Sequence, residues 1–151
     1  RLQEALDIAT KENLPKYVCL QDHYNLMERN PFECDQQEVL KKNNLSALPF
    51  YGLAKGFLSG KYRPGVTVES VRAEAAKEYM TPTGWAIIDA LDAIAKNHGA
   101  SMSAVALAWL RSNPTVSAPI ASARTVEQLL EIIQIVKLSP DEVEQLNTAS
   151  R

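Results

Sequence analysis

Residues 45–62, LSALPFYGLAKGFLSGKY, join a short apolar segment to a loop that holds three glycines and two lysines. Residues 45–50 have the length and composition of a β-strand. A tight turn needs glycine but seldom three with lysines beside them, whereas a loop whose backbone approaches a phosphorylated ligand needs both. The stretch therefore predicts a strand that runs into a phosphate-binding loop, in which Gly52, Gly56 and Gly60 let the backbone approach the ligand.

Segments of regular structure alternate along the rest of the chain. Short β-rich stretches predict two further strands, at residues 17–21 and 116–120. Apolar periodicity and capping residues predict helices, which cover residues 2–13, about 35–42, 85–98, 103–113 and the stretches that follow residues 125 and 139. Strands separated by helices rather than by tight turns run parallel, so the predicted fold class is α/β.

Capping residues mark several of the helix ends. Gly99 is the expected C-terminal stop of one helix, and Ser101 or Ser103 caps the next. Two capping boxes precede the last two helices; they are Thr125 with Gln128 and Ser139 with Glu142, the second followed by Pro140 at the favoured first position.

Length and composition indicate a single globular domain over residues 1–151. The chain has 46% hydrophobic and 23% charged residues, which is ordinary for a packed domain. The net charge of -2 and the pI near 5.7 give no electrostatic footprint for nucleic acid or for an anionic membrane. We therefore expect neither of these partners.

The remaining composition favours a cytoplasmic protein. Two cysteines, Cys19 and Cys34, in a short chain with no leader sequence favour free thiols in a reducing compartment. His23 and His98 are not at metal-ligand spacing, and the cysteines form no metal motif, so no metal is expected. No run approaches the ~18 consecutive apolar residues that a membrane span requires.

The predicted sheet is small for a parallel one. Three parallel strands with helices on one side leave two bare edges, and parallel sheets are rarely left uncovered. The chain also opens at Arg1 in a helical pattern, with no initiator methionine or cap before it. We therefore expect the segment to be part of something larger, with further chain upstream.

Four extended motifs carry a resemblance to a known family. They are QDHYNLMER at 21–29, PFYGLAKGFLSGKYRPG at 49–65, SAVALAWLRSNPTVSAPIASARTVEQLLE at 103–131 and LSPDEVEQLNTAS at 138–150. In this order and spacing they resemble the aldo-keto reductases, in particular the bacterial and channel-associated branches. The resemblance covers almost the whole chain.

The resemblance implies a (β/α)8 TIM barrel that reduces aldehydes and ketones with NADPH, the cofactor lying across the carboxyl ends of the strands. The three predicted strands correspond to the family's sixth, seventh and eighth, and the first helix follows its fifth. The chain therefore resembles the carboxyl-terminal half of the barrel. The family's catalytic aspartate, tyrosine, lysine and histidine have no matching position here, so no catalytic residue is assigned.

The resemblance implies a cofactor role for residues at the ends of the first two strands. Gln21 matches a glutamine that bonds the nicotinamide carboxamide, and Phe50 matches an aromatic residue that stacks on the nicotinamide. Leu53 and Lys55 match the turn that crosses the pyrophosphate, and Lys55 or Lys61 can neutralise its charge. Without the resemblance, each residue has an ordinary structural explanation. Gln21 could bond a loop backbone at the strand end, Phe50 could be a core residue, and either lysine could be a solvated surface cation.

The segment after the third strand matches the positions that, in the family, surround the 2'-phosphate of the adenosine ribose. It leads into a helix amino terminus, which favours anions. Ser122, Arg124 and Gln128 match positions there, and a forked pair from Arg124 to the phosphate favours NADP(H) over NAD(H). Gln128 is equally explained by the capping box. Glu131 can accept from the adenine amino group, whereas Ile132 stands where many relatives have asparagine.

We predict from this resemblance an NADP(H)-dependent oxidoreductase of aldehydes or ketones, of which this chain is the cofactor-binding half. Residues 63–80 are a candidate loop for the small carbonyl substrate, and Tyr24 and Tyr62 are expected to be packing residues. Two alternatives remain: an NADP(H)-binding regulatory subunit of the channel-associated type, and an inactive half-barrel without the catalytic tetrad, which would form homo-oligomers through its bare strand edges.

Overall fold

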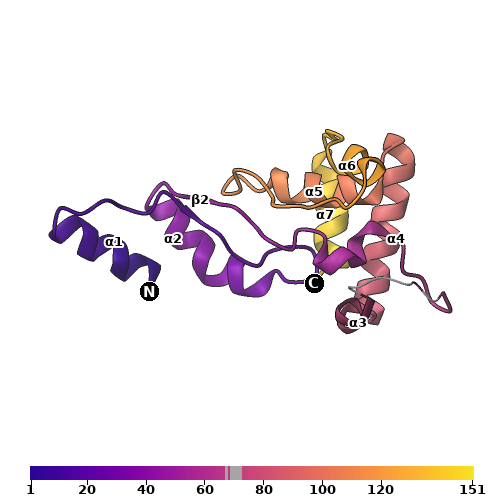
Figure 1. Cartoon of the computed structure of the whole chain (residues 1–151), viewed down its shortest axis with the longest axis horizontal. Coiled ribbons are helices and arrows are strands. Elements are labelled where there is room, and N and C mark those ends of the chain that lie inside the picture. Colours follow the sequence, from indigo (N-terminus) through magenta and orange to yellow (C-terminus); the bar gives the residue numbers. More distant parts are fainter. Residues whose placement is uncertain (67, 69–72) are drawn as a thin grey trace.

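The computed structural model describes residues 1–66, 68 and 73–151, and it is rich in helix with little strand. The elements, with η marking a π-helical (η1) or 3-10 (η2, η3) turn, are α1 Leu2–Lys11, β1 Cys19–Leu20, η1 Phe32–Gln36, α2 Gln37–Lys42, β2 Ser46–Ala47, η2 Ala54–Ser59, α3 Ala73–Ala76, η3 Lys77–Tyr79, α4 Pro82–His98, α5 Met102–Ser112, α6 Val126–Ile132 and α7 Pro140–Ala149. The body is elongated: α1 and α2 lie at one end and α3 to α7 gather at the other, with extended segments between them (Figure 1).

The strands run parallel, as predicted. In the two-stranded sheet, Cys19 of β1 lies opposite Ser46 of β2, and Leu20 lies opposite Ala47. The parallel pairing continues beyond the strands, because the backbone N–H of Phe50 donates to the carbonyl oxygen of Asp22 at 2.9 Å. This pairing brings the ends of the two segments together, where the glycine-rich loop begins.

The predicted strand at residues 116–120 is not formed, and the other two strands are shorter than expected. Val116 makes a single parallel bridge with Ala47. Pro119 has no N–H to donate to a ladder, which prevents a regular strand across this segment. The order and direction of the segments were therefore predicted correctly, but their length as strands was wrong.

The predicted helix ends are largely confirmed. Gly99 follows α4 with a left-handed φ of 57°, and Ser101, rather than Ser103, caps α5. Ser139 and Glu142 form both hydrogen bonds of a capping box at the start of α7. The helical turn of η1 and the cap of α4 were not predicted.

Only one of the two hydrogen bonds of the capping box predicted for α6 is formed, so this prediction is partly wrong. The Thr125 side chain accepts from the backbone N–H of Gln128 at 3.3 Å, as a box requires. The Gln128 Oε1, however, accepts from the backbone N–H of Arg124 at 3.0 Å instead of that of Thr125. The glutamine side chain therefore reaches one residue further back than the motif predicts.

Replacing Glu142 with alanine is expected to destabilise the protein by about 1 kcal/mol near neutral pH, because Glu142 both completes the cap and pairs with His98. Its carboxylate accepts from Ser139 N and lies 2.8 Å from His98 Nε2. The backbone N–H of Ser139 holds the pKa of Glu142 below its ordinary value. A lowered carboxyl pKa contributes stability above the ordinary value, and this contribution is lost as the pH falls through the folded value.

Urea unfolding of wild type and Glu142→Ala at about pH 7 and about pH 3 measures this effect. We expect the difference in unfolding free energy to shrink at the lower pH. An equal difference at both pH values would show that the ionised carboxylate is not responsible.

Helices α4 and α5 form the centre of the hydrophobic core. One face of α4 lies in this core: Ile88, Leu91 and Ile94 are at most 1% exposed, and Trp85 is partly buried against the same cluster. α5 is buried along nearly its whole length, and α4 packs against both α5 and α7. The loop that follows β2 packs on α5 through η2.

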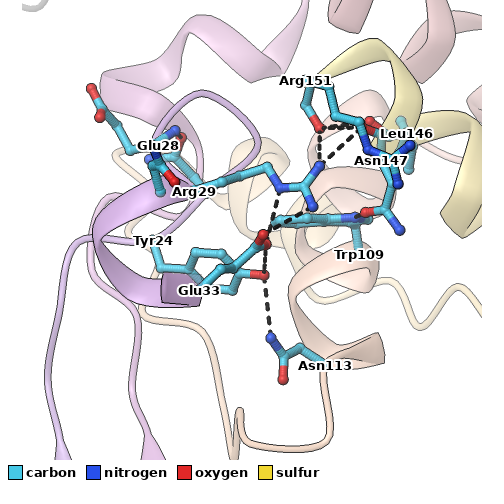
Figure 2. A network of polar contacts seen from close by, with 12 residues as sticks. Tyr24, Glu28, Arg29, Glu33, Trp109, Asn113, Leu146, Asn147 and Arg151 are labelled. Carbon is cyan, nitrogen blue, oxygen red and sulfur yellow. Dashed lines mark hydrogen bonds and ion pairs between the residues drawn. The ribbon is translucent and has the colours of Figure 1, made fainter. Parts of the chain in front are cut away.

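A polar network ties the segment after β1 to α5 and α7 (Figure 2). The Tyr24 hydroxyl donates to Glu33 Oε1 at 2.8 Å, and Arg29 makes two hydrogen bonds to the Glu33 carboxylate, at 2.9 and 3.0 Å. The Arg29 guanidinium also lies 5.5 Å from the centroid of the Trp109 ring and donates to the Asn147 carbonyl oxygen at 2.9 Å. Burial raises the pKa of Tyr24, so its hydroxyl stays protonated and able to donate.

Apolar side chains are exposed at the sheet edge and on α6. Tyr17 and Val18, just before β1, are 64% and 76% exposed, and α6 has no buried residue.

In the part of the chain that the structure describes, no helix is long and apolar enough to cross a membrane. Both cysteines are free thiols, as predicted.

Candidate functional site

A cavity of about 740 Å³ lies between the loop after β2 and the segment before α6. This volume falls within the range of small-molecule pockets, about 300 to 1,000 Å³. Eight of the nine residues that the resemblance assigned to a cofactor line it: Phe50, Leu53, Lys55, Lys61, Ser122, Arg124, Gln128 and Glu131. Gln21 is the exception, because it lies exposed just after β1 and does not line this cavity.

The loop at the cavity has an unusual backbone conformation. Three consecutive residues, Ala54, Lys55 and Gly56, have positive φ angles of 46°, 55° and 91°. Left-handed backbone is uncommon outside glycine and costs of order 1 kcal/mol or more for each such residue. The surrounding structure must therefore hold this turn in place.

Two glycines of the loop have a packing role that the sequence did not predict. A Cβ on Gly52 would lie 3.0 Å from the side chain of Leu110, and one on Gly60 would lie 2.2 Å from Met102 Sδ. Gly60 also has a left-handed φ of 78°. These glycines allow the loop to pack directly on α5, which places the loop at the cavity.

Aromatic rings form one end of the cavity. Phe50 stacks on the His23 imidazole at 5.3 Å between centroids and 21° between planes, and Tyr51 meets both rings edge-on. Phe50 and Tyr51 line the cavity. Phe50 thus lies at the cavity and is only partly buried, which is compatible with the stacking role expected from the resemblance.

Asn25 holds this aromatic cluster in place. It is fully buried, donates to the Tyr51 carbonyl oxygen at 3.0 Å and lies 3.2 Å from His23 Nε2. Its Oδ1 accepts from the backbone N–H groups of Met27 and Glu28. Sequence reasoning missed Asn25; the signal was a polar residue between the apolar residues of the motif at 21–29.

Lys55 is not a solvated surface cation. Its ammonium group pairs with the carboxylate of Glu78 on η3 and lies 6.0 Å from the Tyr51 ring and 5.5 Å from the Tyr79 ring. The hydrogen bond from Lys55 holds the pKa of Glu78 below its ordinary value. Lys61, the second predicted lysine, also lines the cavity, and its ammonium group lies 5.0 Å from the Tyr62 ring.

At the other end of the cavity, the polar groups available to a ligand are mainly side chains rather than backbone N–H groups. α6 has only 7 residues, and Gln128 and Thr125 already satisfy backbone N–H groups at its start. Ser122 and Arg124 line the cavity, are exposed, and make no side-chain hydrogen bond to another described residue. An anion at this end would therefore meet the Arg124 guanidinium and the Ser122 hydroxyl rather than a long helix dipole.

The two predicted packing tyrosines, Tyr24 and Tyr62, are each 2% exposed. Among the described residues, no three His, Cys, Asp or Glu side chains gather as they would around a metal ion. The predicted substrate loop at 63–80 includes residues 67 and 69–72, which lie outside the described residues; its last part forms α3 and η3.

Parallel segments pair here with helices behind them, and a cavity lies at the ends of these segments. This is the arrangement of part of a TIM barrel, whose site lies at the carboxyl ends of its strands. The family model described as "Aldo/keto reductase family" matches residues 1–151. The chain belongs to the aldo-keto reductase family, and the barrel fold expected from the sequence is confirmed.

Similar proteins include a putative voltage-gated potassium channel subunit beta from Schizosaccharomyces pombe, which is 32% identical over 97% of this chain and 46% of that protein. Protein tas from Escherichia coli is 31% identical over 91% of this chain and 40% of that protein. The solved structure of a thermostable aldo-keto reductase, Tm1743, with the inhibitor epalrestat has a TM-score of 0.66 and 27% identity, over 95% of this chain and 43% of that chain. The chain thus spans less than half the length of these relatives.

Proposed function

We propose that this chain is the cofactor-binding part of an NADP(H)-dependent oxidoreductase that reduces small aldehydes or ketones to alcohols in the cytoplasm. The observation that carries the proposal is that eight of the nine cofactor residues expected from the resemblance line the same cavity. Three of these are cations, Lys55, Lys61 and Arg124, which suits a ligand with several phosphate groups.

The residues fit such a cofactor in three places. Phe50 offers an aromatic face for the nicotinamide ring, Lys55 and Lys61 offer charge beside the pyrophosphate, and Arg124 offers a guanidinium for the 2'-phosphate. When bound, NADPH supplies the hydride that reduces a carbonyl carbon. The part played by this chain is to bind and orient the cofactor, since none of its residues matches the family's catalytic tetrad.

Replacing Arg124 with alanine is expected to weaken NADPH binding about tenfold and to change NADH binding less than about twofold, because only NADPH carries the 2'-phosphate. Titration calorimetry of the full-length protein with each nucleotide measures both affinities. Arg151→Ala is the matched control, since it removes an exposed arginine that pairs with Glu144 and does not line the cavity.

Two results would contradict the proposal. If the wild-type protein binds neither nucleotide, the cavity is not a dinucleotide site. If Arg124→Ala weakens NADPH and NADH binding equally, Arg124 does not recognise the 2'-phosphate, and the preference for NADP(H) has another origin.

A second candidate function is an NADP(H)-binding regulatory subunit, which the similarity to a putative potassium channel subunit beta supports. This function needs the same nucleotide site, so nucleotide affinity cannot separate the two. Turnover can: we expect the full-length protein to oxidise NADPH when given simple aldehydes. Tight NADPH binding with no consumption across a panel of aldehydes and ketones would favour the regulatory function.

A further inference from the structure

One cation of the cavity already has an acidic partner from outside the cavity lining. The ammonium group of Lys55 makes an ion pair with Glu78, which lies on η3 between Lys77 and Tyr79. Lys55 lines the cavity and Glu78 does not. The pair therefore connects the cavity to a segment more than 20 residues further along the chain.

The two partners differ in how much they depend on each other. The Lys55 side chain is 24% exposed and its ammonium group lies near the rings of Tyr51 and Tyr79, at 6.0 and 5.5 Å, whereas the Glu78 side chain is 51% exposed. Water can solvate Glu78 if Lys55 leaves it, so breaking this pair costs little. An unpaired Lys55, in contrast, would remain beside two aromatic rings and the cavity.

A phosphate group is a stronger partner for Lys55 than a half-exposed carboxylate. It carries more charge and offers more acceptor oxygens, and the cavity surrounds it with the further cations Lys61 and Arg124. The left-handed turn at Ala54 to Gly56 keeps the Lys55 backbone at the cavity whether or not Glu78 is bound.

We propose that Glu78 competes with the ligand for Lys55: a diphosphate bound in the cavity takes Lys55 from Glu78, and water then solvates the released carboxylate. This inference rests on the proposed function, because it takes the ligand to be a dinucleotide. It goes further by assigning Glu78 as a residue that lowers affinity and selects among phosphorylated ligands. A ligand that places no phosphate beside Lys55 does not compete with Glu78 and gains nothing from its removal.

Replacing Glu78 with glutamine is therefore expected to strengthen binding. We expect the Kd for NADP+ to fall roughly two- to fivefold, the size of effect that a partly exposed ion pair supports. The Kd for adenosine 2'-monophosphate, which reaches only the Arg124 end, should stay within about 1.5-fold of the wild-type value. Titration calorimetry of the full-length protein at low ionic strength, where screening is weakest, measures both constants.

Two controls separate competition for Lys55 from a general change in charge. Glu74→Gln removes the same charge from α3, where Glu74 is 85% exposed and pairs with Lys77 at 2.6 Å, and it should leave NADP+ binding unchanged. In a Lys55→Gln background, Glu78→Gln should also have no effect, because the cation for which it competes is absent.

The outcomes distinguish this inference from the proposed function. If the wild-type protein binds no NADP+, the proposed function fails and the inference fails with it. If the wild-type protein binds NADP+ and Glu78→Gln binds it equally or more weakly, the dinucleotide site stands and competition by Glu78 is wrong; weaker binding would show that Glu78 helps to hold the bound state. An equal gain from Glu74→Gln would also overturn the inference.

Discussion

Replacing Arg29 with methionine is expected to lower the free energy of unfolding by about 2 to 3 kcal/mol, because several groups lose the same partner at once. Arg29 neutralises Glu33, whose side chain is 28% exposed, while its own side chain is only 17% exposed. It also satisfies the Asn147 carbonyl oxygen at 2.9 Å and the Ser150 Oγ at 2.7 Å, at the end of α7 (Figure 2). Methionine keeps part of the packing against Trp109 but none of these bonds.

Chemical denaturation of the full-length protein measures this loss. Arg151→Met is the matched control: Arg151 pairs with Glu144 at 3.2 Å with side chains 67% and 59% exposed, so its loss should be within about 0.5 kcal/mol. Adding Glu33→Gln to Arg29→Met should recover part of the loss, because no carboxylate then remains without its cation. Equal losses for Arg29→Met and Arg151→Met would show that the hydrogen bonds of Arg29 contribute no more than one exposed ion pair.

Replacing Gly84 with alanine is expected to destabilise the protein by about 2 to 3 kcal/mol, although alanine is the better helix former. Gly84 lies in the first turn of α4 and is buried. A Cβ there would meet the Tyr79 carbonyl oxygen at 2.0 Å and the Phe57 ring at 3.2 Å. The gain in helix propensity is about 1 kcal/mol and cannot offset a clash with backbone, because backbone atoms cannot move aside as a flexible side chain can.

Thr83→Ala is the control for this substitution, since Thr83 is the exposed neighbour in the same turn and should change stability by less than about 0.5 kcal/mol. Thermal unfolding followed by circular dichroism compares the two variants. A neutral or stabilising Gly84→Ala would mean that α4 can shift away from η3 at no cost.

The site and the core depend on the same few contacts. The loop after β2 rests on α5 through Gly52 and Gly60, and α5 is held against α4 and α7 in the core. The lysines of this loop are therefore carried by a backbone that packs on the core, which favours a fixed position at the binding site. Arg124 and Glu78, by contrast, are exposed or half exposed, so substitutions there should change binding with little effect on folding.

Much of the cavity could be predicted from the sequence, because its residues come from two continuous motifs. Phe50, Leu53 and Lys55 lie within six residues of one another, and Ser122 to Glu131 lie within ten. Asn25 and Glu78 could not be predicted. Asn25 acts on Tyr51, 26 residues away, and Glu78 pairs with Lys55, 23 residues away, across segments whose approach no local pattern encodes.

The resemblance to the aldo-keto reductases indicated the residues that meet at the cavity. The sequence by itself determined where most helices begin and end and the parallel order of the chain. These depend on hydrogen bonds and periodicities over three or four residues, as in the cap formed by Ser139 and Glu142. Only the tertiary structure decided how long the strands are, that Lys55 is paired, and that Arg29 joins the end of α7, 118 residues away. The length of a strand depends on the backbone that pairs with it, and an ion pair depends on the charge that lies beside each group. These partners are distant in sequence and meet only when the whole chain has folded.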